Sequence, residues 1–340
     1  MASSVIIHIG NPKSYSTTIQ NSASLCERNN GIVYTGFRPN EDLTSWYQSA
    51  LESKLLNVGL RYQNRFHFNE MFQQYQDYVG SQLVLAEQQQ LEYFVSSENI
   101  AMKGLTNELD SYEKLRRLNS LFPERKKCVL IFRNIKRAVY SMYKEYVNHG
   151  YSFNFQCFLN EVYKYREFNF LDALLPNLML KQIAETQSDK TTIEFVFTNN
   201  VPNYNLLKNS FSFLELYGEA HRKNTSESMQ VCEVISKLNA KNSIGLSMLG
   251  MSETHRLFWH ELDKDDDFYW LKRRIIKQNI KVGIQSVCNS NNKNHFDQHF
   301  YNSALYEYLK ANKQAMLHNL EKVDQVLVTR GDIEDVWQGI

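Results

Sequence analysis

The sequence has few of the residues that interrupt or cross-link a chain. Its 340 residues include five prolines, 13 glycines and five cysteines, and the cysteines show no Cys-x-x-Cys or Cys/His ligand spacing. An odd number of cysteines without that spacing argues against a disulfide framework and against a structural zinc site. We therefore expect reduced thiols. The scarcity of proline and glycine leaves no clear linker, so we expect a single domain that spans residues 1–340.

The sequence also lacks a long apolar run and an excess of charge of either sign. It has no stretch of about 18 apolar residues that could cross a membrane, and an expected strand begins at Val5, which leaves no room before it for a signal peptide. With 38 basic and 37 acidic side chains the net charge is +1, so no overall field draws the protein to nucleic acid or to an anionic membrane. These features predict a cytoplasmic protein. A lumenal enzyme without its anchor would present the same pattern.

Short runs rich in β-branched and aromatic residues alternate with longer amphipathic segments. Strands that alternate with helices in this way indicate βαβ units, which build a parallel β-sheet flanked by helices, an α/β fold. From residue 226 to residue 340 helical patterns predominate. Residues 37–90 form an insertion between the second and third strands, and we expect this insertion to form one wall of a binding site. The predicted strands are Val5–Ile9, Ile32–Thr35, Tyr93–Ser97, Cys128–Phe132 and Thr192–Thr198.

The first predicted strand leads directly into a polar loop, residues 10–18 (GNPKSYSTT), and then into a helix that extends to about Asn29. A strand that feeds the N-terminus of a helix aims backbone N–H groups and the positive end of the helix dipole at one point, which suits a phosphate. The hydroxyl residues add donors and the lysine adds a charge. The alternative is that the hydroxyls only cap the helix and the lysine is solvated. The candidate phosphate ligands are Lys13, Ser14, Tyr15, Ser16, Thr17 and Thr18.

This loop does not match the Walker A motif of nucleoside triphosphatases. That motif requires GxxxxGK[ST], whereas here Gly10 precedes Lys13 by three positions and no glycine stands directly before the lysine. A nucleotide or nucleoside kinase with a degenerate loop is an alternative. Such an enzyme would need Mg²⁺ ligands that the sequence does not offer.

A second strand-to-helix junction carries a complementary pattern. The predicted strand Cys128–Phe132 ends in Arg133, and Ser141 follows eight residues later, one to two turns into the next helix. A guanidinium offers a bidentate fork and a hydroxyl offers a third hydrogen bond, so the two side chains can converge on one phosphate. The alternative is an arginine paired with a surface carboxylate and a serine on an exposed helix face.

Both motifs resemble those of sulfotransferases that use 3′-phosphoadenosine-5′-phosphosulfate (PAPS). Residues 11–20, NPKSYSTTIQ, align without a gap with the family's 5′-phosphosulfate loop, Pro-Lys-Thr-Gly-Thr-Thr-Ser-Leu-Gln, except that Tyr15 stands where the family has glycine. Residues 133–143, RNIKRAVYSMY, resemble the 3′-phosphate motif, Arg-Asn-Pro-(Lys/Arg)-Asp-x-x-x-Ser-x-Tyr, with the same spacing from arginine to serine. A weaker similarity in the C-terminal half is to the bacterial and glycan-modifying branch.

The resemblance implies a P-loop-kinase-like sulfotransferase fold with helical additions. It implies an enzyme that transfers the sulfuryl group of PAPS to a hydroxyl of an acceptor, such as a carbohydrate, a glycolipid or a small molecule, and releases 3′-phosphoadenosine-5′-phosphate (PAP). No metal is expected, because the donor itself brings the reactive group. The alternative is a catalytically weak nucleotide-binding protein, because Tyr15 replaces the glycine that lets a peptide approach its ligand closely.

Sulfuryl transfer to an alcohol needs a base for the hydroxyl proton and a cation beside the leaving phosphate. Lys13 fits the second role. In the resembled family the base is a histidine or glutamate at the end of the third strand, which here is Glu98. Alternatively, Glu98 caps the next helix and His149, on the helix of the second motif, is the base. His8 lies inside the first strand, where we expect a packing residue.

Overall fold

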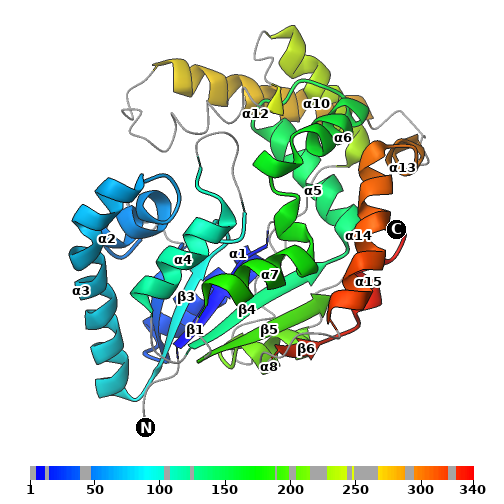
Figure 1. The fold of residues 1–340 in the computed structure, drawn as a ribbon. Helices are drawn as coiled ribbons and strands as arrows, with labels where there is room; N and C mark the ends of the chain where they lie inside the picture. The colour runs from blue at the N-terminus through cyan, green and yellow to red at the C-terminus, as the bar shows by residue number, and fades with distance from the viewer. Residues whose placement is uncertain are drawn as a thin grey trace.

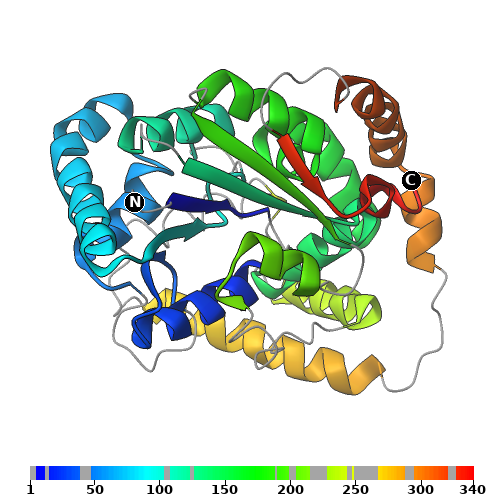
Figure 2. The ribbon, with the colours of Figure 1, turned by 90° about the horizontal axis from the view of Figure 1, so that it is seen from below.

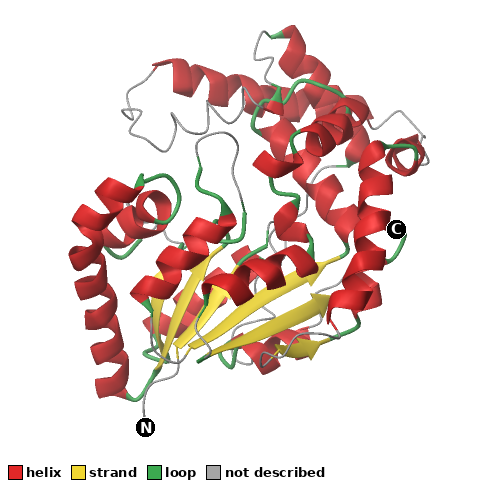
Figure 3. Ribbon diagram, in the orientation of Figure 1, coloured by secondary structure: helices red, strands yellow, loops and turns green. Residues whose placement is uncertain are grey.

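Six parallel strands form the centre of the protein, in the order β2-β3-β1-β4-β5-β6, with helices on both faces of the sheet (Figures 1 and 3). The predicted α/β fold with a parallel sheet is therefore confirmed. The structure is a computed structural model of the whole chain, and it describes residues 5–11, 15–38, 47–102, 108–122, 126–187, 190–198, 204–214, 228–242, 247–248, 267–287, 295–320 and 327–340.

Five of the strands lie where the sequence predicts them, to within two residues at each end, because strands buried on both faces form unbroken apolar runs. The sixth was not predicted; it has only four residues and lies at an edge of the sheet. The strands are β1 (Val5–Ile9), β2 (Ile32–Gly36), β3 (Glu92–Ser97), β4 (Lys126–Arg133), β5 (Thr191–Thr198) and β6 (Leu327–Arg330).

The helices fill the connections between the strands, and they make up most of the described residues from 228 onward. The described part of the insertion between β2 and β3 is helical as well. Their bounds are α1 (Ser16–Arg28), α2 (Ala50–Ser53), the π-helix η1 (Lys54–Gly59), α3 (Arg65–Gln89), α4 (Ser111–Leu121), α5 (Ile135–Asn148), α6 (Phe155–Lys164), the 3₁₀ helices η2 (Arg166–Phe168) and η3 (Asp172–Leu174), α7 (Pro176–Thr186), α8 (Tyr204–Ser210), α10 (Met229–Lys241), α12 (Asp267–Val287), α13 (His295–Tyr301), α14 (Ala304–Leu320) and α15 (Ile333–Trp337).

Alternate residues of the strands point into two separate cores. Ile7 packs in the core that contains α3, α4, α5 and α7, and Ile6 packs in the core that contains α1 and α8. Figure 2 shows α1 and α8 on one side of the sheet and α4 and α7 on the other. The helix that follows β1 and the helix that follows β4 therefore lie on opposite faces, although β1 and β4 are neighbours in the sheet.

This arrangement makes the β1–β4 boundary a topological switch point. Connections that leave adjacent parallel strands toward opposite faces open a crevice at the carboxyl ends of those strands, and ligands of open α/β sheets bind there. Both sequence motifs begin at this boundary, one at the end of β1 and one at the end of β4.

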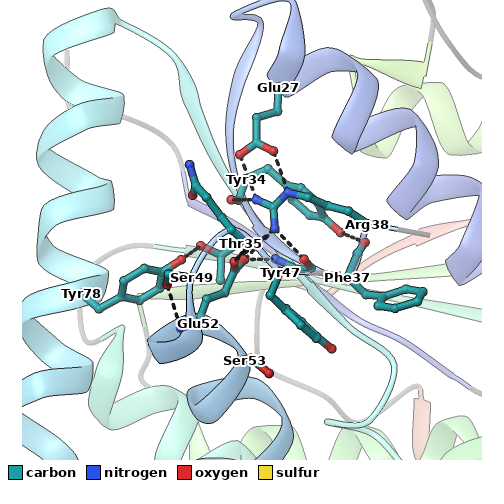
Figure 4. Close-up of polar contacts among 12 residues, drawn as sticks. Glu27, Tyr34, Thr35, Phe37, Arg38, Tyr47, Ser49, Glu52, Ser53 and Tyr78 are labelled. Carbon is teal, nitrogen blue, oxygen red and sulfur yellow. Dashed lines mark hydrogen bonds and ion pairs between the residues drawn. The ribbon is translucent and has the colours of Figure 1, made fainter. Parts of the chain in front are cut away.

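A buried cluster of charges anchors the start of the insertion to the sheet (Figure 4). Arg38 follows β2 and is only 3% exposed. Its Nε and Nη2 donate to the carboxylate of Glu27 at 2.9 and 3.0 Å, and its Nη1 donates to both oxygens of Glu52 at 3.1 Å. The Glu52 carboxylate also accepts from the backbone N–H groups of Gly36 and Gln48 at 2.7 and 2.6 Å. The end of α1, the end of β2 and helix α2 are thus held together.

The C-terminal helices pack beside the second motif. Helix α10 contacts α5 and α12, whereas α13 and α14 contact α6. Helix α15 contacts β4, β5 and α5 and buries the side chain of Trp337 completely. No helix in the described part of the chain has the length and apolarity to cross a membrane. Four of the cysteines are free thiols, namely Cys26, Cys128, Cys157 and Cys232.

Candidate functional site

The N-terminus of α1 carries the first candidate site. The helix starts at Ser16 and ends at Arg28, as the sequence predicts, but no side chain caps its first turn and no acidic residue lies there. Ser16 is 3% exposed and its Oγ has no hydrogen-bond partner among the described residues, whereas Thr17 is exposed and Thr18 half-buried. A buried hydroxyl and uncapped N–H groups at one helix end form a set of donors suited to an anion.

Tyr15 directly precedes this helix and has a left-handed backbone, with φ of 64° and ψ of 11°. A glycine adopts that conformation without a steric penalty. The backbone at position 15 therefore has a conformation suited to glycine, the residue that the sequence motif of the resembled family carries there. The candidate ligands Lys13 and Ser14 lie outside the described residues.

The end of β1 is tied to both neighbouring strands. The buried Asn11 side chain donates from Nδ2 to the carbonyl of Ile131 on β4, at 3.1 Å, and the Gly10 N–H donates to Ser97 on β3, at 3.3 Å. Gly10 also lies against Glu98: a Cβ on this glycine would come within 2.5 Å of the Glu98 Cα and 2.7 Å of its Cβ. The backbone of Glu98 thus lies against the end of β1, on the side of β3.

Arg133, the last residue of β4, lies on the other side of β1. Burial lowers the pKa of its guanidinium, Arg137 lowers it further, and the Tyr15 hydroxyl opposes that shift. The pairing of β1 with β4 and the hydrogen bond from Asn11 to Ile131 bring the start of the first motif close to the end of β4. Two neighbouring arginines in a partly desolvated position favour an anion, because its negative charge offsets their mutual repulsion.

Asn134 fixes the backbone that follows Arg133. Its Oδ1 accepts from the N–H of Arg137 at 3.1 Å and so caps α5, while its Nδ2 donates to the carbonyls of Gln338 at 2.8 Å and Asp335 at 3.3 Å. The chain's last turn is thereby attached to the start of the second motif. Ser141 lies on α5, half-buried, one to two turns beyond this cap.

Glu98 is exposed, and its charge contributes to the raised pKa of Tyr47 in the insertion. Burial raises the pKa of Tyr47 to about 12; a hydrogen bond to Asn57 and the charge of Arg61 lower it, and the charges of Glu52 and Glu98 raise it. Tyr47 donates to the Asn57 Oδ1 at 3.1 Å. A tyrosine of the insertion therefore lies near the candidate base, where the sequence predicts a binding wall.

His149, the alternative base, lies away from the junction. It is the C-cap of α5, 52% exposed, and its Nδ1 donates to the Glu145 carbonyl at 2.8 Å. A 14-residue helix is about 21 Å long at 1.5 Å per residue, so this histidine is roughly that far from the beginning of α5. The geometry favours Glu98 over His149.

His8 is a packing residue, as predicted. It is fully buried in β1, its Nδ1 lies 2.9 Å from the Oγ of Ser96, and its ring meets Phe211 edge to face. Burial lowers the pKa of His8 to about 3, so the imidazole is neutral at physiological pH.

Three residues near the site were missed at the level of the sequence: Arg137, Asn134 and Tyr47. The first two lie within the second motif, where their position next to Arg133 was the available signal. Tyr47 had no comparable signal, because its place near Glu98 depends on how the insertion folds back. Within the described part of the chain, no three His, Cys, Asp or Glu side chains gather where they could hold a metal ion.

Comparison with known proteins gives no relative for this chain: no family model, no curated protein and no solved structure matches it. Its function must therefore be inferred from the site itself.

Proposed function

We propose that the protein is a sulfotransferase that moves the sulfuryl group of PAPS to a hydroxyl of an acceptor. The observation that carries the proposal is that both phosphate-type motifs start at one switch point of a parallel sheet, where Asn11 after β1 donates to Ile131 of β4 and Glu98 lies beside the end of β1. An anion-binding loop alone would fit many nucleotide-binding proteins. The second motif and the carboxylate make the combination specific.

The residues present suit a ligand with phosphate groups at both ends. The N-terminus of α1, with Ser16, Thr17 and Thr18, would hold the 5′-phosphosulfate. Arg133 and Ser141 would hold the 3′-phosphate. The left-handed backbone at Tyr15 supports this assignment, because it is a glycine-type conformation at the place where the motif has glycine.

The reaction needs one proton transfer from the acceptor hydroxyl to a base of this chain. The Glu98 carboxylate takes the proton of the acceptor hydroxyl as the new O–S bond forms. The bond from sulfur to the bridging phosphate oxygen breaks, and PAP leaves with that electron pair. Lys13 is proposed to place a positive charge beside this oxygen, where negative charge collects in the transition state.

Titration calorimetry with PAP and with AMP tests the nucleotide site. Arg133→Ala should weaken PAP binding by ~2–4 kcal/mol, because a charged bidentate contact is lost, and should leave AMP binding nearly unchanged. Arg116→Ala is the matched control, since Arg116 is partly exposed on α4 and pairs with Glu113. Equal affinity of the wild type for PAP and AMP would remove Arg133 and Ser141 from the site.

Transfer from labelled PAPS to a panel of glycans, glycolipids and small alcohols tests the chemistry. Glu98→Gln keeps the shape of the side chain but removes the base, so the rate should fall by ~10²–10⁴ with little change in PAP affinity. Glu87→Gln, an exposed glutamate on α3, is the control. PAP binding without any transfer would point to a nucleotide-binding protein without turnover, and transfer that needs Mg²⁺ would point to a kinase.

A further inference from the structure

Three charged side chains form a buried cluster beneath the Glu98 turn. Arg61 belongs to the insertion, Glu108 to the connection after β3, and Lys114 to the first turn of α4; each side chain is at most 2% exposed. The Glu108 Oε1 accepts from the Arg61 Nε at 2.8 Å and from the Lys114 Nζ at 2.6 Å. The cluster therefore carries one net positive charge in the interior, which is costly unless every charged group is hydrogen-bonded.

Lys114 uses all three of its N–H donors. Besides Glu108, its Nζ donates to the carbonyl oxygens of Asn99 at 2.8 Å and of Met102 at 2.5 Å. These two carbonyls belong to the turn that starts at Glu98, and a hydroxyl from α4 adds a third tie, from the Ser111 Oγ to the Ala101 carbonyl at 2.8 Å. Two of the three acceptors of the Lys114 ammonium are carbonyls of this turn, so the lysine holds the turn in place.

Arg61 connects the same cluster to the insertion. Its backbone carbonyl accepts from the N–H of Leu109 at 2.7 Å, and its guanidinium lies over the ring of Tyr62 with 4.9 Å to the centroid. Burial disfavours ionisation of Glu108, but Arg61 and Lys114 outweigh it and hold the pKa of Glu108 below its ordinary value. The carboxylate therefore stays charged and keeps both cations in place.

We propose that Lys114 is a positioning residue: by donating from its Nζ to the carbonyls of Asn99 and Met102, it holds the turn that presents the Glu98 carboxylate at the end of β3. The proposal rests on the proposed role of Glu98 as the base. Glu108 favours the charged form of the lysine and also accepts from Arg61, so the insertion and the turn after β3 share one support.

Lys114→Met and Arg61→Met make a matched pair for the test. Each variant removes one cation and leaves the other paired with Glu108, but only Lys114→Met releases the turn carbonyls. Hydrogen–deuterium exchange of the amides at residues 98–102 should accelerate by about tenfold to a hundredfold in Lys114→Met, the effect of losing a charged hydrogen bond. In Arg61→Met exchange at these amides should stay close to wild type.

Kinetics give the second measurement. In Lys114→Met, kcat should fall by about tenfold or more while the Kd for PAP stays within about twofold, because the proposed nucleotide contacts come from α1, the end of β4 and α5. Lys114→Arg, which keeps a charge and several donors, should restore part of the rate. If Lys114→Met does not fold, Lys114→Gln keeps two donors and should give intermediate exchange.

Equal exchange at residues 98–102 in Lys114→Met and Arg61→Met would overturn the role of Lys114, whatever the activity. Wild-type turnover in Lys114→Met would overturn it as well. A wild type that binds no PAP would instead refute the proposed function, and the exchange result would still decide whether Lys114 holds the turn.

Discussion

At the scale of single residues, Tyr15 has a backbone conformation that suits glycine and not a residue with a side chain. A non-glycine residue in the left-handed region costs roughly 1–2 kcal/mol, and such strain persists only where the surroundings impose it. Tyr15 pays this cost directly before a helix N-terminus that no side chain caps. The conformation of this loop is thus retained in spite of the residue.

Two substitutions at this position separate the backbone requirement from the loss of the ring. Tyr15→Asn and Tyr15→Val both remove the aromatic group, but asparagine tolerates left-handed φ and a β-branched residue does not. We expect Tyr15→Val to be less stable than Tyr15→Asn by about 1–2 kcal/mol in urea unfolding, and to bind PAP more weakly. Equal stability of the two variants would show that the loop tolerates another conformation.

At the scale of elements, one side chain joins the second motif to the end of the chain. Asn134 caps α5 with its Oδ1 and holds the carbonyls of α15 with its Nδ2, so the position of Arg133 depends on residues more than 200 positions later. Trp337, the last residue of α15, is fully buried and adds apolar contact to this attachment.

Asn134→Ala should therefore cost more than the loss of an ordinary helix cap. The control is Asn64→Ala, because Asn64 caps α3 by accepting from the His67 N–H at 2.9 Å and lies far from the motif in the chain. We expect Asn64→Ala to lower the free energy of unfolding by about 1 kcal/mol and Asn134→Ala by about 2–3 kcal/mol. In calorimetry only Asn134→Ala should weaken PAP binding; an equal loss in both variants would argue against the attachment.

Helix α4 makes a pH-dependent contribution to the stability of the fold through Lys114. Burial and the charge of Arg61 lower the pKa of this lysine, Glu108 and Asp110 oppose the shift, and the resulting pKa is about 8 instead of 10.5. Between pH 8 and 10.5 the unfolded chain binds the proton and the folded chain does not, so the contribution of this group to stability rises with pH in that window.

Unfolding experiments on wild type and Lys114→Met at pH 7 and pH 10 measure that contribution. The stability of the wild type relative to the variant should increase by on the order of 2–3 kcal/mol across this range. A constant difference would mean that the folded protein keeps the ordinary lysine pKa.

The same elements explain what the sequence could and could not reveal. Strands buried on both faces, such as β1 and β4, form apolar runs, and the carboxyl ends of parallel neighbours lie at one edge, so the meeting of the two motifs could be anticipated. Strand β6 is too short to show a pattern. The charged clusters were not predicted, because nothing in the sequence distinguishes a buried lysine or arginine, such as Lys114 or Arg61, from a solvated one. In addition, Arg61 and Glu108 are 47 positions apart.

At the scale of the whole molecule, the cluster around Arg38 ties the start of the insertion to the sheet. Arg38→Met would leave the carboxylates of Glu27 and Glu52 without their cation, with Glu52 fully buried. Removing one partner of a buried pair costs about 3–5 kcal/mol. Burial already raises the pKa of Glu52 against the opposing effect of Arg38, so the variant should bind a proton there.

A double-mutant cycle tests this expectation by urea unfolding. Arg38→Met should lose about 3–5 kcal/mol, and adding Glu52→Gln should recover part of that loss, because the buried charge is removed. Arg116→Met, at a partly exposed ion pair with Glu113, should lose at most about 1 kcal/mol. Additive losses at Arg38 and Glu52 would show that the two side chains stabilise the fold independently.

The strand order also has a consequence for how the protein is made. Of the six described strands, the first to leave the ribosome is a central one, and its Val5 pairs with Tyr93 on one side and Lys126 on the other. At roughly 5–20 residues per second of synthesis, β1 waits on the order of 5 to 25 seconds before both partners exist. During that time an apolar strand with two open edges is exposed, so newly made chains that stop before β4 should bind holding chaperones, and chains that extend past β5 should not.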